Sequence, residues 1–589
     1  MGSVCREIVT IQLGHYSNFV GTHWWNLQDA SLSYEPDSTA PLSELQSDVL
    51  FREGMTLGGQ VTYTPRLIAM DLKGSLQTLR QEGSLERANK KTHFFRIWKA
   101  THSLNTHSLK NPFLLDLDKL EEGEILAEPE FSTAQLQQCS GAVAVPTVNS
   151  SLEHAQKLYR LEGSVRVWSD FLRIHLHPRT ISVINQYNHD GESQRLKAFG
   201  QGEALCQGVV LEQLEDRLHF FVEECDYLQG FQVLCDIADG FSGLGSKVTE
   251  LLHDSYGGRG ILTWGLAPVN HPDSTPVKEF YHLMNYALGT INMANHSSFF
   301  CPLTLRGGLG LRPTPPASFP HLNYDPTLWF HSAAVLALAL DSLTVSYRLQ
   351  HHSAPMWHLA DALAVSGRKV VAAYGAIPFP MTQGSSLPDA LAGYTDTLPW
   401  RPLSACSELG DGRCFSQSVT LRGLEGQSLV SPLALGWSPH PLHSSRSGEE
   451  VLTDFLRTHY PSTPLAVHLL SQPSKVTPPF PQIFSPYLDS QGSLRPQNMP
   501  PNTVSSLPVL SSLQSSPALG PWLSELHRGA TALDPRRVAP SFLSQGPEIG
   551  EMQEALDQLR TLAHCYRDDR AESCTRPLRT TTTTTDSLL

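Results

Sequence analysis

A glycine-rich turn between two apolar segments constrains this chain most. Residues 228–234, LQGFQVL, have the character of a buried strand, and residues 248–252 have that of a helix. Between them lies the segment 240–246, GFSGLGS. A strand, a glycine turn and a helix start direct unpaired backbone N–H groups and the positive end of a helix dipole to one point, which can bind phosphate. The pattern predicts either a phosphate site or a plain turn between a strand and a helix.

The spacing of this turn excludes two well-known phosphate motifs. In a P-loop the lysine is followed by serine or threonine, whereas the order here is Ser246-Lys247. The glycines at 240, 243 and 245 also fail the G-x-G-x-x-G pattern of dinucleotide-binding folds. The turn by itself leaves both interpretations open.

Composition indicates a large folded protein whose main partner is not nucleic acid. With 589 residues the chain can form about two to four domains. Its apolar content of 40% and charged content of 17% allow a sizeable core. The net charge of −14, without a long basic stripe, disfavours phosphate-backbone contacts.

Cysteine usage and hydropathy favour a cytosolic protein. None of the ten cysteines forms a C-x-x-C pair, so neither a zinc ribbon nor a dithiol redox site is indicated. Their scatter through apolar segments is typical of reduced, buried thiols. No signal peptide is apparent, and the apolar run at 333–340 is far shorter than the about 20 residues that span a bilayer. Membrane association is therefore expected to be peripheral.

Strand and helix patterns alternate along the first two thirds of the chain. Strand patterns occur at 6–13, 67–70, 171–178, 180–184, 228–234, 261–268 and 370–374. Helical patterns occur at 211–225, 248–252 and 333–349, and the last is apolar on most faces, which suggests a central helix. This alternation predicts a largely parallel, doubly wound sheet, and such sheets bind ligands at the carboxyl ends of their strands.

Three other features are less specific, and two of them have two interpretations. His175 and His177 lie on one face of an expected strand and are either metal ligands or plain strand histidines. No third ligand with metal spacing lies nearby in the sequence. From residue 376 the chain is rich in Pro, Ser and Gly, notably at 471–516, which indicates short strands, loops and linkers. Apolar residues at 549–566 recur at helical spacing, which predicts an amphipathic helix. This helix packs either in the core or against a partner.

Several segments, taken together, resemble tubulin in the order of that family. They are REIVTIQLG at 6–14 with Asn18, YTPR at 63–66 followed by DLKG at 71–74, CDYLQGFQ at 225–232 with the glycine turn, and the segment 358–380. They resemble, in turn, tubulin's first strand and loop, its second phosphate loop, its signature loop and the segment after its central helix. A large insertion at about 80–190 and the block at 167–187 fit one divergent branch, and the whole chain resembles the Misato family.

The resemblance implies an α/β fold with a tubulin/FtsZ-like, doubly wound parallel sheet in the N-terminal domain. A smaller mixed α+β C-terminal domain and a disordered tail follow. The expected boundaries are a tubulin-like segment I at 1–79, a family-specific insertion at 80–190, a tubulin-like segment II at 191–395, a C-terminal domain with Pro/Ser-rich linkers at 396–575, and the tail at 576–589.

The resemblance also implies a guanine-nucleotide site, for GTP or GDP, that has degenerated. The positions that match tubulin's site are Gly14, Asn18, Asp71, Ser242, Gly243 and Gly245. Asp239 adds negative charge where phosphate should lie, and Phe241 adds a side chain where backbone must approach closely. Lys73 replaces an acidic residue, which weakens magnesium coordination but could pair with phosphate directly. No metal site is expected.

Catalysis is expected to be lost. In tubulins the catalytic acid comes from the next subunit, in a loop after the Phe-Pro segment; that loop here is 381–389 and ends in Asp389. Asp389 is either an acid or a plain surface aspartate. Hydrolysis requires magnesium, a positioned water and the acid together, and at least two of these look impaired.

Three functions are consistent with this resemblance. The first is a non-catalytic, tubulin-like regulator of mitochondrial distribution, morphology and fusion, in the cytoplasm or peripheral at the mitochondrial outer membrane. The second is an adaptor for tubulin assembly or a chaperonin. The third is an active, polymerising GTPase, for which Asp389 is the discriminating residue. The implied partners are proteins, among them tubulin, a chaperonin or mitochondrial outer-membrane proteins.

Overall fold

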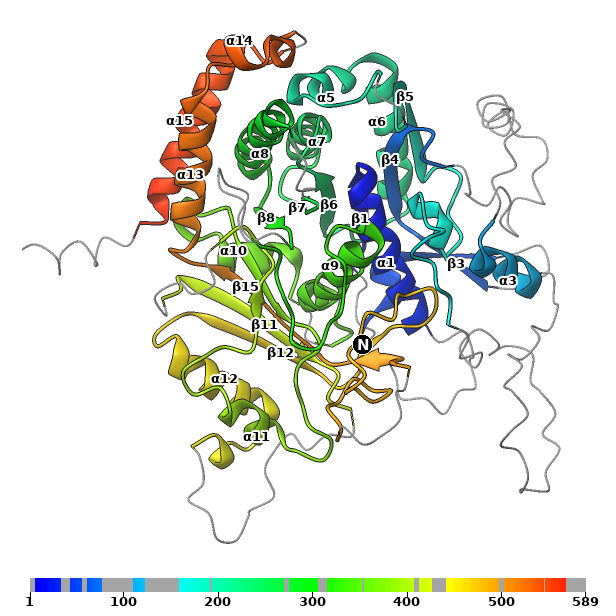
Figure 1. The fold of residues 1–589 in the computed structure, drawn as a ribbon, viewed down its shortest axis with the longest axis vertical. Coiled ribbons are helices and arrows are strands. Elements are labelled where there is room, and N and C mark those ends of the chain that lie inside the picture. The colour runs from blue at the N-terminus through cyan, green and yellow to red at the C-terminus, as the bar shows by residue number, and fades with distance from the viewer. Residues whose placement is uncertain are drawn as a thin grey trace, which may run out of the picture.

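A computed structural model of the chain shows two large sheets with a central helix between them (Figure 1). It describes residues 6–32, 43–55, 61–76, 110–121, 158–190, 193–269, 275–305, 315–351, 354–406, 413–425, 441–496, 503–544 and 546–567. The tail expected at 576–589 and most of the insertion expected at 80–190 lie outside these ranges.

The first sheet has six parallel strands in the order β5-β4-β1-β6-β7-β8. The strands are β1 (Ile8–Leu13), β4 (Leu67–Lys73), β5 (Ile181–Asn188), β6 (Gly230–Asp236), β7 (Gly260–Leu266) and β8 (Phe299–Leu303). Every residue of β1, β6, β7 and β8 is buried. Continuous apolar strands of this kind form parallel sheets that are covered on both faces.

Helices cover both faces of this sheet, which confirms the doubly wound architecture. They are α1 (His15–Ser31), α5 (Phe199–Leu205), α6 (Gly208–Glu223), α7 (Phe241–Ser255), α8 (Pro276–His296) and α9 (Trp329–Leu343). Because successive side chains of a strand point to opposite faces, Val9 and Ile11 pack in the core that contains α6, α7 and α8. Ile8 packs in the other core, with α1 and α9.

The second sheet is mixed and has the order β10-β9-β15-β11-β12. Its strands are β9 (Ala372–Ala376), β10 (Arg401–Pro402), β11 (Ser416–Arg422), β12 (Leu465–Leu470) and β15 (Val509–Ser515). All pairs are antiparallel except the parallel pair β11–β12. Three helices belong to this unit. Helices α10 (Met356–Leu363) and α12 (Gly448–His459) pack on the sheet, and α11 (Leu387–Ala392) packs on α12. This is a smaller mixed α+β unit, as the family resemblance implies. It includes β9, however, which corrects the expectation that the strand at 370–374 belongs to the parallel sheet.

Helix α9 lies between the two units, as its apolar sequence predicts. All of its residues from Ser332 to Leu343 are buried. It packs on α1 at the first sheet and on β11 and β15 of the second. Its sequence lacks a polar stripe because each of its faces meets protein.

The helix expected at 549–566 is a core helix. Helices α13 (Leu519–Ala532), α14 (Pro535–Val538) and α15 (Ile549–Cys565) end the described chain. Met552, Leu556 and Leu559 are buried where α15 packs on α8 and α13, which lie beside it in Figure 1. The apolar stripe of α15 thus faces the protein interior.

The strand expected at 171–178 is absent. Residues Trp168–Phe171 form a short 3-10 helix, and residues 172–180 continue without regular structure up to β5. Pro178, the last residue of the expected strand, lacks the N–H group that a ladder needs. The His177 ring instead stacks on Phe220 of α6, with 4.9 Å between ring centroids.

The remaining described elements are short. They are β2 (Phe51–Met55), β3 (Val61–Pro65), α3 (Pro112–Glu121), β13 (Ser474–Lys475), β14 (Ser506–Leu507) and further 3-10 helices at Ser47–Val49, Val345–Tyr347, Val365–Gly367, Pro441–Ser444 and Pro540–Leu543. Strands β2 and β3 form an antiparallel hairpin before β4.

Candidate functional site

The predicted site residues follow neighbouring strands at one edge of the first sheet. Strand β1 lies between β4 and β6, and all three run parallel. Gly14 follows β1, Asp71 lies near the end of β4, and Asp236 ends β6. The carboxyl ends of parallel strands share an edge, so the topology brings these residues together at the usual ligand position of such a sheet.

The side chain of Asp236 occupies the N-terminus of α1. Its carboxylate accepts hydrogen bonds from the backbone N–H groups of Tyr16 at 2.9 Å and Ser17 at 2.7 Å, and from the Ser17 hydroxyl at 2.6 Å. Gly14 adopts φ 111°, and a Cβ there would overlap this carboxylate. Helix N-termini bind phosphate through these same N–H groups. Here a protein carboxylate satisfies them.

Asp71 is held by three side chains, two from α1 and one from the 3-10 helix Trp168–Phe171. Its Oδ2 atom lies 2.8 Å from His15 Nδ1, accepts the indole N–H of Trp168 at 2.8 Å, and accepts the amide of Asn18 at 3.3 Å. Burial by itself raises the pKa of Asp71, but the proximity of His15 and its other hydrogen bonds outweigh this, so the pKa is lowered. The ionised carboxylate is thus bound by the protein itself.

Aromatic rings surround the His15–Asp71 contact. The His15 ring packs against His189 with 3.7 Å between centroids, and lies 5.3 Å from the Phe19 ring and 5.9 Å from that of Trp329. Burial lowers the pKa of His189. A triphosphate is highly charged and hydrated, so placing it among aromatic rings would be unfavourable. Protein side chains fill this part of the sheet edge instead.

The segment 240–246 is helical, which corrects the expected glycine turn. Helix α7 begins at Phe241, with Gly240 as its N-cap. Asp239 starts this helix early, because its Oδ1 atom accepts the N–H of Phe241 at 2.9 Å and its carbonyl accepts the Ser242 hydroxyl at 2.7 Å. Phe241 itself is 1% exposed and packs in the core.

The glycines of α7 allow close packing of α5. A Cβ on Gly243 would overlap the carbonyl oxygen of Phe199, and a Cβ on Gly202 of α5 would overlap that of Gly240. Gly245 similarly faces Cys235 of β6. Ser242 is fully buried against Gly289 of α8. The glycine pattern that signals phosphate binding in the sequence thus serves helix contacts.

Two buried carboxyl groups, those of Asp236 and Asp239, disfavour phosphate binding at this edge of the sheet. Burial raises the pKa of Asp236, and the nearby Asp239 raises it further. Burial also raises the pKa of Asp239, to about 7. Burial and the proximity of two like charges both disfavour negative charge at this position. A phosphate would add charge to the same space.

The alternative catalytic residue, Asp389, belongs to a helix cap. Ser386 caps α11, and Asp389 Oδ2 accepts the N–H of Ser386 at 3.1 Å. Its other oxygen lies 3.0 Å from Nε2 of His443. The hydrogen bond from the Ser386 side chain is the largest cause of the lowered pKa of Asp389. A stabilised carboxylate with these partners is a weak base.

The structure places the predicted residues in two groups. Gly14, Asn18 and Asp71 lie together at the sheet edge, and Ser242, Gly243 and Gly245 lie along α7 behind it. Three residues of this edge were not predicted from the sequence: Trp168, which donates to Asp71, His189, which packs on His15, and Asp236. Asp236 lies two residues after the expected strand at 228–234, and that position was the available signal.

The described residues contain no group of three or more His, Cys, Asp or Glu side chains arranged to hold a metal ion. None of the helices within the described ranges combines the length and apolar character needed to cross a membrane.

Comparison with known proteins agrees with the tubulin-like architecture. Residues 6–119 match the Misato Segment II tubulin-like domain, and residues 160–349 match the tubulin domain. Protein misato homolog 1 of Danio rerio is 66% identical, covering 97% of this chain and 99% of that protein. Its Homo sapiens counterpart is 48% identical, and protein misato of Drosophila melanogaster is 30% identical, each covering 96% of this chain and 99% of the relative.

Proposed function

Because the chain belongs to the Misato family of tubulin-like proteins, we propose that it is a non-catalytic regulator of mitochondrial distribution, morphology and fusion. The mitochondrial part of this proposal is supported by the family resemblance of the insertion and of the block at 167–187. The non-catalytic part is supported by the state of the former phosphate site.

One observation carries the non-catalytic part. The carboxylate of Asp236 makes the hydrogen bonds at the N-terminus of α1 that a nucleotide phosphate would need. Asp71, the remaining candidate ligand for a magnesium ion, is engaged by His15, Trp168 and Asn18. Phosphoryl transfer depends on positioned phosphates and metal, and this arrangement provides for neither.

A turnover assay tests the non-catalytic part. Purified full-length protein is incubated with GTP and magnesium over a range of protein concentrations, beside an Asp389→Asn variant. The expected result is no turnover above the protein-free rate for either protein. Magnesium-dependent turnover that rises with protein concentration and disappears in Asp389→Asn would establish the polymerising GTPase instead.

A cellular experiment tests the mitochondrial part. Cells depleted of the protein are expected to show altered mitochondrial shape and distribution, and both the wild type and Asp389→Asn should restore them equally. Fractionation should recover the protein in the cytoplasm and, in part, on mitochondria, from which alkaline carbonate should release it. Normal mitochondria after full depletion would contradict the proposal.

An adaptor for tubulin or a chaperonin is the second candidate. Two observations favour it. The tubulin-like fold is retained, with both large sheets and the central helix α9, and the side chain of Asp236 fills the position of a phosphate. Such a fold can present tubulin-like surfaces without a nucleotide cycle. Recovery of tubulin or a chaperonin with the purified protein, and of no mitochondrial protein, would favour this candidate.

A further inference from the structure

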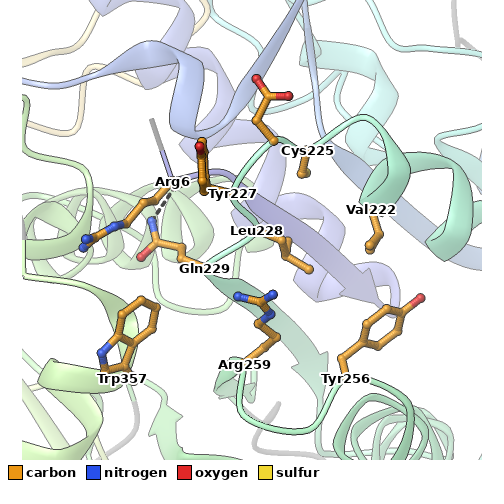
Figure 2. A pocket seen from close by; sticks show the side chains of 10 residues that line it. Arg6, Val222, Cys225, Tyr227, Leu228, Gln229, Tyr256, Arg259 and Trp357 are labelled. Atoms are coloured by element: carbon orange, nitrogen blue, oxygen red, sulfur yellow. Dashed lines mark hydrogen bonds between the residues drawn. The ribbon is translucent and has the colours of Figure 1, made fainter. Parts of the chain in front are cut away.

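A cavity of about 340 Å³ lies at the opposite edge of the first sheet from Asp71 and Asp236. Its lining includes Arg6, Tyr227, Gln229, Tyr256, Arg259 and Trp357 (Figure 2). Arg6 precedes β1, Gln229 precedes β6 and Arg259 precedes β7. The amino ends of these neighbouring strands share one edge, so the topology brings the three residues together.

Gln229 forms a fixed floor for this cavity. It is 2% exposed, and its amide donates to the backbone carbonyl of Arg6 at 2.7 Å. Its side-chain oxygen accepts the N–H of Met356 at 3.1 Å, at the start of α10. The floor thus joins the chain before β1 to the helix that carries Trp357, and it holds these two walls in place.

The walls combine positive charge with aromatic rings. The Arg6 guanidinium lies over the Trp357 ring, 5.6 Å from its centroid, and Arg259 approaches from the turn after α7. On the far side, the Tyr256 ring packs against Phe231 at 5.0 Å. Among the described residues, neither arginine takes part in an ion pair. Asp226 is the acidic member of the lining, and the nearby Glu7 carboxylate accepts the backbone N–H of Tyr227 at 2.8 Å.

We propose that this cavity binds a small organic anion, a carboxylate or a phosphate monoester carried on a planar, apolar body. Guanidinium groups bind such oxyanions through paired N–H donors. The Trp357 and Tyr256 rings offer apolar surfaces for the body of the ligand. Small-molecule sites have volumes of about 300–1,000 Å³. The cavity is therefore sized for a compact ligand and lies apart from the former nucleotide site.

The experiment measures binding of benzoate and phenyl phosphate to full-length protein by titration calorimetry, with benzamide as the uncharged analogue. Saturable binding of at least one anion is expected, weakened by added salt because the arginines are exposed. Arg6→Gln and Arg259→Gln should each weaken it about tenfold, the loss of about 1.4 kcal/mol. Trp357→Leu should weaken the binding of both anions.

Arg537→Gln is the matched control, because Arg537 has an 89% exposed side chain on α14, far from the cavity. It should leave the affinity unchanged. The cavity arginines are exposed, so their variants should fold, and thermal unfolding verifies this. No saturable binding of either anion, equal binding of benzamide, or affinity unaffected by both cavity variants would overturn the proposal.

Discussion

At the scale of single residues, one carboxylate changes what the sheet edge can do. Asp236 satisfies the first N–H groups of α1, and Gly14 leaves room for it. From sequence, Asp239 and Phe241 already indicate a degenerate site. The role of Asp236 could not be predicted, because its partners Tyr16 and Ser17 lie about 220 residues away along the chain.

Removal of this carboxylate should destabilise the protein and create an anion site. Asp236→Ala leaves two buried N–H groups without an acceptor, and we expect a loss of about 2 kcal/mol in the free energy of unfolding. Formate, which matches the missing group, should restore part of this stability. Urea unfolding with and without formate measures both effects.

The control for that experiment is Asp361→Ala, on the exposed face of α10. It should change stability little and should not respond to formate beyond the wild type. An Asp236→Ala protein as stable as the wild type would show that the cap contributes nothing.

At the scale of elements, the contact between α5 and α7 explains the glycine signature. The sequence predicts the strand β6 and the helix after it, but the helix begins earlier than the pattern indicates. Glycines are compatible with a phosphate loop and with close helix packing. Only the position of α5, whose Gly202 meets Gly240, distinguishes these uses, and periodicity does not encode that position.

Substitution of Gly243 tests the helix contact. Alanine favours a helix over glycine, yet its Cβ would overlap the Phe199 carbonyl, so Gly243→Ala should lose about 1–3 kcal/mol of stability. Gly550→Ala in α15, where a Cβ meets nothing within 4 Å, should be neutral or stabilising. Thermal unfolding of both variants measures the difference. Similar midpoints for the two would refute a packing role for Gly243.

At the scale of the whole molecule, a buried ionic cluster joins the two units. Asp341 of α9 pairs with Arg422 of β11 at 2.6 Å and with Arg348 at 3.0 Å. It also accepts hydrogen bonds from Gln28 of α1 at 2.9 Å and Ser474 of β13 at 2.8 Å. The apolar pattern of α9 predicts a central helix. Apart from the nearby Arg348, however, the partners of its one acidic residue come from distant segments and could not be predicted from the sequence.

This cluster should make stability depend on pH in the acidic range. Burial raises the pKa of Asp341, but Arg422 and Arg348 outweigh it and lower the pKa to about 2. Because its pKa is lowered on folding, ionised Asp341 stabilises the fold by about 2 kcal/mol at pH values above about 4, the pKa of an aspartate in the unfolded chain. This stabilisation is lost as the pH falls toward 2. The stability gap between wild type and Asp341→Asn should therefore narrow between pH 4 and pH 2.

Urea midpoints measured from pH 7 to the acid limit of folding test this expectation. Asp361→Asn, at an exposed position, serves as the control and should follow the wild type at every pH. A gap between wild type and Asp341→Asn that stays constant down to the acid limit would show that the ion pairs do not set the pH dependence.

The central claim is that protein side chains have replaced the nucleotide at the carboxyl edge of the first sheet. The most direct test is the nucleotide content of full-length protein, purified without added nucleotide, denatured, and analysed by ion-exchange chromatography with purified tubulin as the positive control. We predict no GTP or GDP, or only a small fraction of the protein concentration. Stoichiometric guanine nucleotide, released only on denaturation, would contradict the account.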